Sequence, residues 1–485
     1  MRTFRLLPAL AFILFIQLNA CAQSADTQDK IKQVEKNLAG NIQIEGEGPY
    51  NMADRMAYYK IEGVSVAVIH NYKIEWAKGY GWADDSLKIP VTTQTLFQAA
   101  SISKSLNSVG VLKLVQDKKI DLYADINTYL TTWKFPYDSL SKGKKISMAN
   151  LLSHTGGLTV HGFGGYEKGE AIPTIVQILD GKKPANSDPI RSMYEPGLKS
   201  EYSGGGITIS QLIVMDVTHQ PYDKYMYEHV LKPLGMTSST YSQPPVGVKP
   251  ELLATGYRPD GKELKGKYHI YPEQAAAGLW TNPTDLSKYI IETQLAYAGK
   301  SHKVLNKEIT HIRLTPYLNR NAALGVFIDN LDSTKYFEHG GANEGFRCQY
   351  YGSLEDGNGV VVMVNSDNGD IIPEIVNSVA KVYSFKGLYR SKLRKIVAVA
   401  DTVLQSYIGD YELEPKFILT ISREGNHLYG QATGQGKSEI FPETQNKFFL
   451  KTAQFIELEF IKNDKGEIGK LLLYQNGTHE AKKIK

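Results

Sequence analysis

The chain has 485 residues, of which 42% are hydrophobic and 22% are charged, and its formal net charge is +4. This composition is that of an ordinary globular protein and excludes a disordered or fibrous chain. The small net charge argues against binding to nucleic acid, and the length allows one large domain with a smaller one.

The first 22 residues predict an export signal. A basic start, MRTFR, precedes an apolar run, LLPALAFILFIQL, which is shorter than the roughly 20 residues that cross a bilayer. Residues 18–21 (LNAC) resemble a bacterial lipobox, which would lipidate Cys21 and tether the chain to a membrane. Residues 20–22 (ACA) also have the A-x-A form of ordinary signal cleavage. We therefore expect an exported protein, either periplasmic or anchored as a lipoprotein.

The first half of the mature chain predicts a hairpin and a buried helix. Residues 24–60 are polar with some helical periodicity, which indicates a linker and a first helix. Residues 63–82 predict a β-hairpin, with alternating valines and a turn at Asn71-Tyr72. Residues 97–116 predict a helix that is apolar on most sides and therefore central. Residues 146–240 mix helices with glycine-rich loops.

The second half predicts a further helix and then strands. Asn282 as N-cap and Pro283 at the first helical position start a helix that we expect to end near residue 297. Four strands and a helix follow, expected at residues 324–328, 336–339, 346–351, 360–364 and 371–384. The order favours an α+β fold, an antiparallel sheet flanked by helices with a helical insertion.

Residues 403–485 predict a small all-β domain that resembles a barrel. Short apolar runs alternate with turn signals such as Lys465-Gly466 and Asn476-Gly477. The basic stretch at residues 386–395 is interpreted as a solvated linker that ends the main domain. The predicted organisation is thus a signal at residues 1–22, a main domain at residues 23–390 and the β-domain.

A Ser-x-x-Lys element at Ser101 and Lys104 is the strongest candidate for chemistry. The pattern occurs four times, starting at Ser101, Ser139, Ser141 and Ser378, but only Ser101 opens a long apolar helix. Residues three apart share a helix face, so Lys104 can reach Ser101. A lysine desolvated at that position has a lowered pKa and can act as a base.

Further elements give the chain a resemblance to a known family. Residues 96–104 (LFQAASISK) resemble the nucleophile segment of the serine β-lactamase and penicillin-binding-protein superfamily, and residues 151–158 (LLSHTGGL) are similar to its LLSHTSGL loop. Tyr202-Ser203-Gly204 stands at the place of the Tyr-x-Asn element, and residues 339–342 (HGGA) at that of the Lys-Thr-Gly strand. These elements follow the family order over about residues 55–385.

The resemblance implies a β-lactamase/transpeptidase-like fold and a role for each matched residue. Ser101 would attack a carbonyl and become acylated, while Lys104 and Tyr202 share the proton transfers. The backbone N–H groups of Ser101 and Ala342 would form the oxyanion hole. His339, Gly340 and Gly341 would line the substrate site, with His339 hydrogen-bonded to the substrate or to Tyr202.

Two departures from the family pattern affect the expected substrate. Gly204 replaces the asparagine of Tyr-x-Asn, and the lysine and threonine of Lys-Thr-Gly are replaced by His339 and Gly340. A permanent positive charge is thereby replaced by a group that can be neutral near pH 7. Both changes favour the branch that resembles class C β-lactamases and contains esterases and D-aminopeptidases.

No cofactor or metal is expected. The chain has no HExxH motif, and His154 and His161 have no carboxylate in register for a metal site. Cys21 and Cys348 are the only cysteines, so a disulfide framework is excluded. The expected partner is a small-molecule or peptide substrate, and the oligomeric state is left open.

The leading hypothesis is a serine hydrolase that forms an acyl-enzyme at Ser101 on an ester, amide or β-lactam carbonyl. A β-lactamase, an esterase and a peptidase such as a D-aminopeptidase or carboxypeptidase all remain open. The alternative is a non-catalytic, penicillin-binding-like sensor for cell-wall fragments, motivated by Gly204 and the His-Gly-Gly element. Intact Ser101, Lys104 and Tyr202 argue against that alternative.

Overall fold

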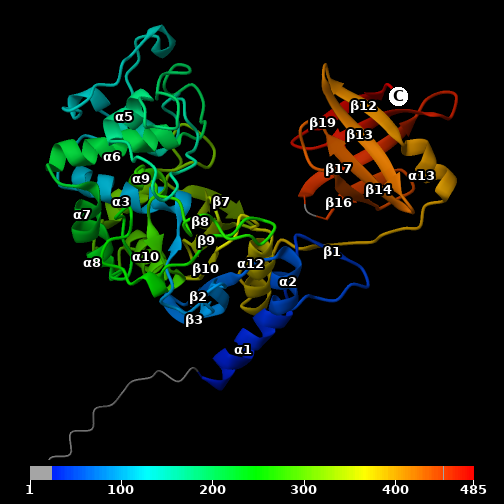
Figure 1. Cartoon of the computed structure of the whole chain (residues 1–485), viewed down its shortest axis with the longest axis horizontal. Coiled ribbons are helices and arrows are strands. Elements are labelled where there is room, and N and C mark those ends of the chain that lie inside the picture. The colour runs from blue at the N-terminus through cyan, green and yellow to red at the C-terminus, as the bar shows by residue number, and fades with distance from the viewer. Residues whose placement is uncertain (1–23, 452) are drawn as a thin grey trace, which may run out of the picture.

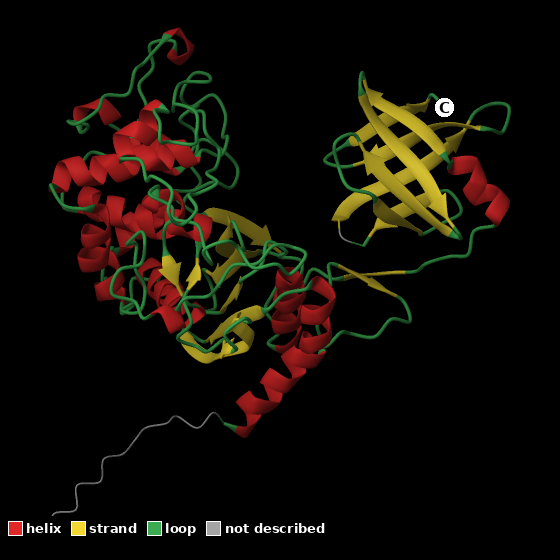
Figure 2. Cartoon of the chain, in the orientation of Figure 1, coloured by secondary structure: helices red, strands yellow, loops and turns green. Residues whose placement is uncertain are grey.

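The computed structural model describes residues 24–451 and 453–485, so the predicted export signal and Cys21 lie outside the described residues. The chain forms a large domain of mixed helices and strands and a smaller all-β domain beside it (Figures 1 and 2). Both parts agree with the predicted fold class, an α+β domain followed by a small β-domain.

A seven-stranded antiparallel sheet organises the large domain, in the order β4-β3-β2-β10-β9-β8-β7. The hairpin expected at residues 63–82 is confirmed as β2 and β3, with Asn71 and Tyr72 both at positive φ in the turn. The sheet strands are β2 (Gly63–His70), β3 (Lys73–Asp84), β4 (Ile89–Pro90), β7 (Phe327–Leu331), β8 (Thr334–Asn343), β9 (Phe346–Ser353) and β10 (Gly359–Val364).

Helices cover both faces of this sheet (Figure 2). Val64, Val66 and Val68 point to one face, where they pack with valines of β10 against α1 (Ala25–Lys36), α2 (Met52–Tyr59) and α12 (Ile371–Val382). The other face carries the larger core, which includes Ile69 and Phe337. Strands buried on both faces therefore form the centre of the domain.

The larger core is formed with the helices between β4 and β7 in the chain. They are α3 (Ser103–Gln116), α4 (Met148–Leu152), α5 (Ile175–Asp180), α6 (Gly204–Thr218), α7 (Tyr222–Met226), α8 (Lys232–Leu234), α9 (Gln274–Ala277), α10 (Pro283–Tyr297) and α11 (Lys307–Arg313). Helix α10 begins as predicted, because the Asn282 side chain accepts the Asp285 backbone N–H at 2.9 Å. This group of helices is the predicted helical insertion.

Two elements at the site differ from the sequence expectation. The expected helix at residues 97–116 is divided into a short strand, β5 (Phe97–Gln98), a 3₁₀ turn (Ala100–Ile102) and then α3. Residues 97 and 98 are extended because they pair with β6 (Trp280–Thr281). Residues 204–206 open α6 and do not form a loop, since the Ser203 side chain caps that helix by accepting the Gly206 N–H at 2.9 Å.

Further corrections concern segments whose structure depends on distant partners. The strand expected at residues 324–328 runs at Phe327–Leu331. The segment interpreted as a solvated linker at residues 386–395 contains β11 (Lys392–Arg394), which pairs in parallel with β1 (Ile42–Ile44). Ile42 therefore lies in a strand and does not continue the first helix.

The C-terminal domain is a closed eight-stranded barrel that follows helix α13 (Asp401–Tyr407). Its strands are β12 (Gly409–Glu414), β13 (Phe417–Glu424), β14 (His427–Ala432), β15 (Ser438–Pro442), β16 (Lys447–Leu450), β17 (Ala453–Lys462), β18 (Ile468–Tyr474) and β19 (Thr478–Lys483). The runs predicted at residues 417–421, 427–431, 456–461 and 470–474 match β13, β14, β17 and β18, while β12, β15, β16 and β19 were not predicted.

A small junction joins the two domains. Ile42 and Ile44 of β1 pack against Phe449 of the barrel. Arg394 of β11 forms ion pairs with Glu443 and Glu457 of the barrel. In the part of the chain that the structure describes, no helix is both long and apolar enough to cross a membrane.

Candidate active site

Ser101 lies in the 3₁₀ turn between β5 and α3. Ala100 has a φ of +47° there, an uncommon conformation for a residue other than glycine. The turn is held in place because Ser103 Oγ donates to the Ala100 carbonyl at 2.5 Å and accepts the Leu279 N–H at 3.0 Å. The Ser101 hydroxyl is thereby presented at the start of α3, half-buried.

Lys104 reaches Ser101 from the first turn of α3. Its Nζ lies 3.0 Å from Ser101 Oγ and donates to the Ala276 carbonyl at 2.7 Å. The residue is 2% exposed, and this burial lowers the pKa of Lys104 to about 7. A large fraction of the amine is therefore uncharged at neutral pH and able to take the proton of Ser101.

Tyr202 lies on the other side of the serine, just before α6. Its phenol forms a hydrogen bond with Ser101, and Lys104 Nζ lies 4.9 Å from its ring centroid. Burial raises the pKa of Tyr202 well above its usual range, although the bond with Ser101 opposes the shift. The phenol is therefore protonated at neutral pH. It can donate a proton, and it can act as a base only after it has lost that proton.

His154 is a site residue to which the sequence analysis gave no role. Its ring centroid lies 4.3 Å from that of Tyr202. Its carbonyl accepts the Glu201 N–H at 2.8 Å, and its Nδ1 accepts the Ser203 N–H at 3.2 Å. His154 thus fixes the peptide groups on both sides of Tyr202. Burial, with Lys104 nearby, holds the pKa of His154 well below its usual range, so the ring is neutral.

His339 lies close to this group. Its Nδ1–H donates to the Gly340 carbonyl at 2.6 Å, and its ring centroid is 6.3 Å from that of Tyr202. Of the two expected hydrogen bonds, the one to Tyr202 is not formed among the described residues, and the one to a substrate stays a prediction. Burial and Lys104 lower the pKa of His339 to about 3. The buried Nε2 has no protein partner in this part of the chain.

A cavity of about 600 Å³ opens at Ser101, a size suited to a small-molecule ligand. The predicted residues Tyr202, His339, Gly340, Gly341 and Ala342 all line it. Gly341 needs to be glycine, since a Cβ there would lie 2.4 Å from the Ala99 carbonyl oxygen. The structure thus brings all of the predicted site residues to one cavity, apart from Lys104, which lies beneath Ser101, and Cys21, which is not described.

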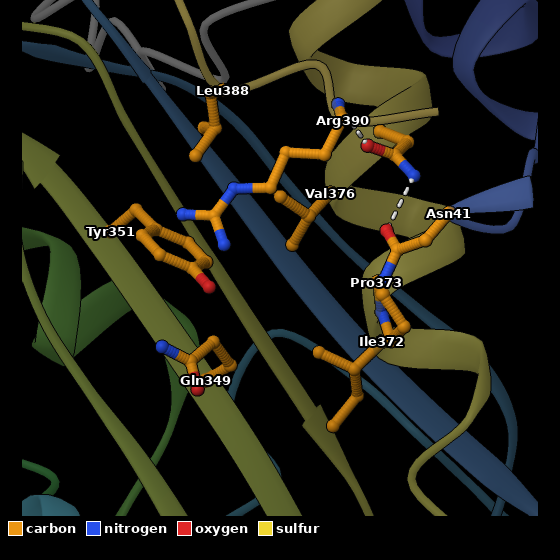
Figure 3. A pocket seen from close by; sticks show the side chains of 9 residues that line it. Asn41, Gln349, Tyr351, Ile372, Pro373, Val376, Leu388 and Arg390 are labelled. Carbon is orange, nitrogen blue, oxygen red and sulfur yellow. Dashed lines mark hydrogen bonds between the residues drawn. The ribbon is translucent and has the colours of Figure 1, made fainter. Parts of the chain in front are cut away.

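Several residues that line the cavity were not predicted from the sequence. Glu338, Arg347 and Gln349 line the cavity, as do Phe327 and the α12 residues Ile372 and Pro373. Only Glu338 had a signal in the sequence, its place next to the His-Gly-Gly element. A second hollow of about 140 Å³ adjoins the cavity and shares Gln349, Ile372 and Pro373 with it (Figure 3). That hollow is too small to hold a substrate by itself.

Gly204 explains one departure from the family pattern in structural terms. A Cβ at this position would lie 3.0 Å from the Phe163 ring and 3.3 Å from the His161 carbonyl oxygen. The loop at residues 161–163 therefore lies so close to α6 that a larger side chain at this position requires the loop to shift by a few tenths of an ångström. Within residues 24–451 and 453–485, no group of three or more His, Cys, Asp or Glu side chains is placed to hold a metal ion.

Comparison with known proteins agrees with this geometry. The model of the beta-lactamase family matches residues 51–373. The chain belongs to the beta-lactamase family. A second family model, a domain of unknown function named DUF3471, matches residues 393–484 and so includes the barrel strands. The beta-lactamase domain thus carries the cavity, and the barrel is matched by a separate family model.

Individual relatives, found by sequence or by structure, share 20–26% sequence identity with this chain. Protein flp of Staphylococcus aureus (strain MW2) is 26% identical over 335 residues, 65% of this chain and 62% of that protein. The octameric penicillin-binding protein homologue from Pyrococcus abyssi has a TM-score of 0.62 at 20% identity and covers 89% of this chain and 98% of its own. The D-amino acid amidase from Ochrobactrum anthropi SV3 has a TM-score of 0.57 at 20% identity, covering 74% and 99%. The match to protein flp spans less than two thirds of the length of that protein. The two solved structures share the fold of this beta-lactamase-family domain.

Proposed function

We propose that this protein is a serine hydrolase that forms an acyl-enzyme at Ser101. The observation that carries the proposal is the contact between Lys104 Nζ and Ser101 Oγ at 3.0 Å, with the amine buried and its pKa lowered to about 7. Burial of a charged lysine lowers the stability of the fold, so a lysine with only a structural role is not expected at this position. A lysine that acts as a base benefits from burial, because its amine is then uncharged near neutral pH.

The proposed reaction begins with proton transfer from Ser101 to the Lys104 amine. Ser101 Oγ then forms a bond to the substrate carbonyl carbon, and the backbone N–H groups of Ser101 and Ala342 stabilise the oxyanion. Tyr202 donates its proton to the leaving group as the carbonyl–leaving-group bond breaks, and the Lys104 ammonium returns a proton to Tyr202. Deacylation follows the reverse path. Tyr202 takes a proton from the attacking water as its own proton passes to Lys104. The bond from the acyl carbon to Ser101 Oγ then breaks, and the Lys104 ammonium protonates Ser101.

Esters and amides fit the cavity better than β-lactams. A neutral, buried His339 supplies no fixed positive charge for the carboxylate of a β-lactam. The amide side chain of Tyr-x-Asn is also missing, and the loop at residues 161–163 packs closely against Gly204. We therefore propose an esterase or peptidase of the beta-lactamase family, which agrees in chemistry with the amidase among the structural relatives.

The same two observations favour a second candidate, a non-catalytic sensor that binds cell-wall fragments. One experiment separates the two. The protein and its Ser101→Ala variant are incubated with a fluorophosphonate and, separately, with a penicillin, and intact masses are measured. A fluorophosphonate adduct on Ser101, absent in the variant, supports the hydrolase. Saturable binding of peptidoglycan fragments with no adduct would instead support the sensor.

A further inference from the structure

Among the described residues, Glu338 is the only acidic one that lines the cavity at Ser101. It precedes His339 on β8, so its side chain leaves the strand on the opposite face, toward α12. Gly340 follows on that face without a side chain, and a Cβ there would lie 2.7 Å from Gln349 Oε1. The cavity therefore passes over β8 at Gly340 and reaches the Glu338 carboxyl group.

The nearby positive charges are already matched by other carboxylates. Arg347, which lines the cavity, pairs with Asp367 at 3.0 Å. Arg390, whose guanidinium lies beside Tyr351 in Figure 3, pairs with Asp329 at 3.0 Å. Neither arginine forms an ion pair with Glu338 in the part of the chain that the structure describes, and the Arg390 charge acts on it only at longer range.

The Glu338 carboxylate also has hydrogen-bond acceptor positions that no described residue uses. Gln349 Nε2 donates to Glu338 Oε2 at 2.5 Å, and this is the only hydrogen bond to the carboxyl group in the described part of the chain. A carboxylate can accept about four hydrogen bonds. Burial, with Asp329 nearby, raises the pKa of Glu338 to about 7, although Gln349 and Arg390 oppose the shift. An added cation would favour the ionised form.

We propose that Glu338 binds a primary ammonium group of the substrate. This inference rests on the proposed hydrolysis at Ser101, and it defines the substrate class of that same cavity. The ammonium group would donate to the carboxylate in a largely desolvated setting, where charge-assisted hydrogen bonds are strong. Gln349 would act as a positioning residue, because its amide holds the carboxylate over β8.

The spacing on β8 sets the distance between the amine and the reacting carbonyl. Gly341 lies against the nucleophile segment at Ala99, and Glu338 lies three residues earlier on the strand. At about 3.3 Å per residue, this separation is roughly 10 Å. The amine is therefore several bonds from the carbonyl, as in a lysine-like side chain, and is not the α-amine of the acyl residue.

The test compares matched substrates with and without an amine. On the acyl side, p-nitrophenyl ε-aminocaproate is compared with p-nitrophenyl caproate. On the leaving-group side, the caproate ester of tyramine is compared with that of p-ethylphenol. The assays are run at about pH 8, above the pKa of Glu338. The ratio of kcat/KM within each pair is measured for the parent, for Glu338→Gln and for Glu355→Gln, an exposed control in the turn after β9.

In the parent and in Glu355→Gln, the amine is expected to raise kcat/KM by about tenfold to a hundredfold in one of the two pairs. In Glu338→Gln this ratio is expected to fall close to one. A ratio near one in both pairs of the parent, or a preference that survives Glu338→Gln, overturns the inference.

A binding experiment keeps the inference testable without turnover. In a Ser101→Ala background, ε-aminocaproamide and caproamide are titrated by calorimetry, with and without Glu338→Gln. Tighter binding of the amine that is lost with Glu338→Gln supports the subsite, and equal binding overturns it. Failure of the uncharged esters to be hydrolysed in a Ser101-dependent way would instead contradict the proposed function.

Discussion

The interiors of the two domains differ in polarity. In the beta-lactamase domain, the buried face of α3 includes Lys104, Ser105 and Asn107, each at most 2% exposed. In the barrel, the buried side chains of residues 401–451 and 455–485 are all apolar or aromatic. Buried polar groups cost stability unless they are bonded. The polar first interior agrees with the proposed chemistry at Ser101, whereas the second interior is filled by apolar packing.

The bonding of these buried groups supports that distinction. Ser105 accepts a hydrogen bond from Tyr350 at 3.0 Å, and Asn107 bonds Ser210 and Tyr222 at 3.0 and 2.9 Å. Lys104 has a lowered pKa, because burial disfavours its charged form. In the barrel, Tyr407 stacks on Phe460 with ring centroids 4.1 Å apart, and such contacts fill the interior.

The largest effect is expected for Lys104→Met. Loss of the base should slow acylation by an activated ester about a hundredfold to ten-thousandfold. The melting temperature should stay constant or rise, since the variant removes a desolvated amine. Stopped-flow acylation and calorimetry measure the two effects, with Lys113→Met on the same helix as a control. Unchanged acylation would show that Lys104 is structural and would remove the contrast between the interiors.

A smaller effect is expected for His154→Ala. The variant loses the ring beside Tyr202 and the acceptor for the Ser203 N–H, so Tyr202 should be misplaced. We expect kcat to fall about tenfold to a hundredfold with little change in KM. Steady-state kinetics test this against His302→Ala, an exposed histidine. A change in KM alone would assign His154 to substrate binding.

The acylation rate should also depend on pH near neutrality. The proposed base is the uncharged amine of Lys104, with a pKa of about 7. The rate should therefore rise with pH and level off above neutrality, and should be about tenfold lower one pH unit below the pKa. The pH profile of kcat/KM for an ester without ionisable groups gives this value. A rate that rises only in the range of ordinary lysines would contradict a desolvated base.

The smallest kinetic effect is expected in the barrel. Phe460→Ala should reduce the stability of this domain by about 3–5 kcal/mol, because it leaves a cavity beside Tyr407. Acylation should change by less than about twofold. Chemical denaturation and the ester assay test the two claims together. Loss of acylation in a folded variant would mean that the barrel supports the active site, and the division of roles would be wrong.

The choice of Ser101 among four similar patterns could be made from local sequence. Ser139 lies in an exposed 3₁₀ turn, and Ser141 is buried against Ser192. Ser378 is buried in α12, where its hydroxyl donates to the Val34 carbonyl at 2.7 Å. These outcomes follow from apolar periodicity and turn residues near each serine, which is information that a single segment carries.

The partners of Glu338 could not be predicted in the same way. Its hydrogen bond to Gln349 depends on the pairing of β8 with β9. Its exposure to the cavity depends on Gly340, which has no side chain to cover it. The effect of Gly204 likewise depends on the loop at residues 161–163, which lies far from it in sequence. Register and loop packing are set by the whole fold, and local patterns do not encode them.

The sequence by itself determined the fold class and the residues of the Ser-x-x-Lys, Tyr-x-Asn-like and His-Gly-Gly elements. Helix periodicity and motif spacing are local, so Lys104 had to lie near Ser101 once the helix formed. Only the tertiary structure decided the electrostatics of the site, namely the lowered pKa of Lys104, the neutral His339 and the raised pKa of Glu338. Burial and charge pairing depend on which distant segments pack together, and these contacts exist only in the folded chain.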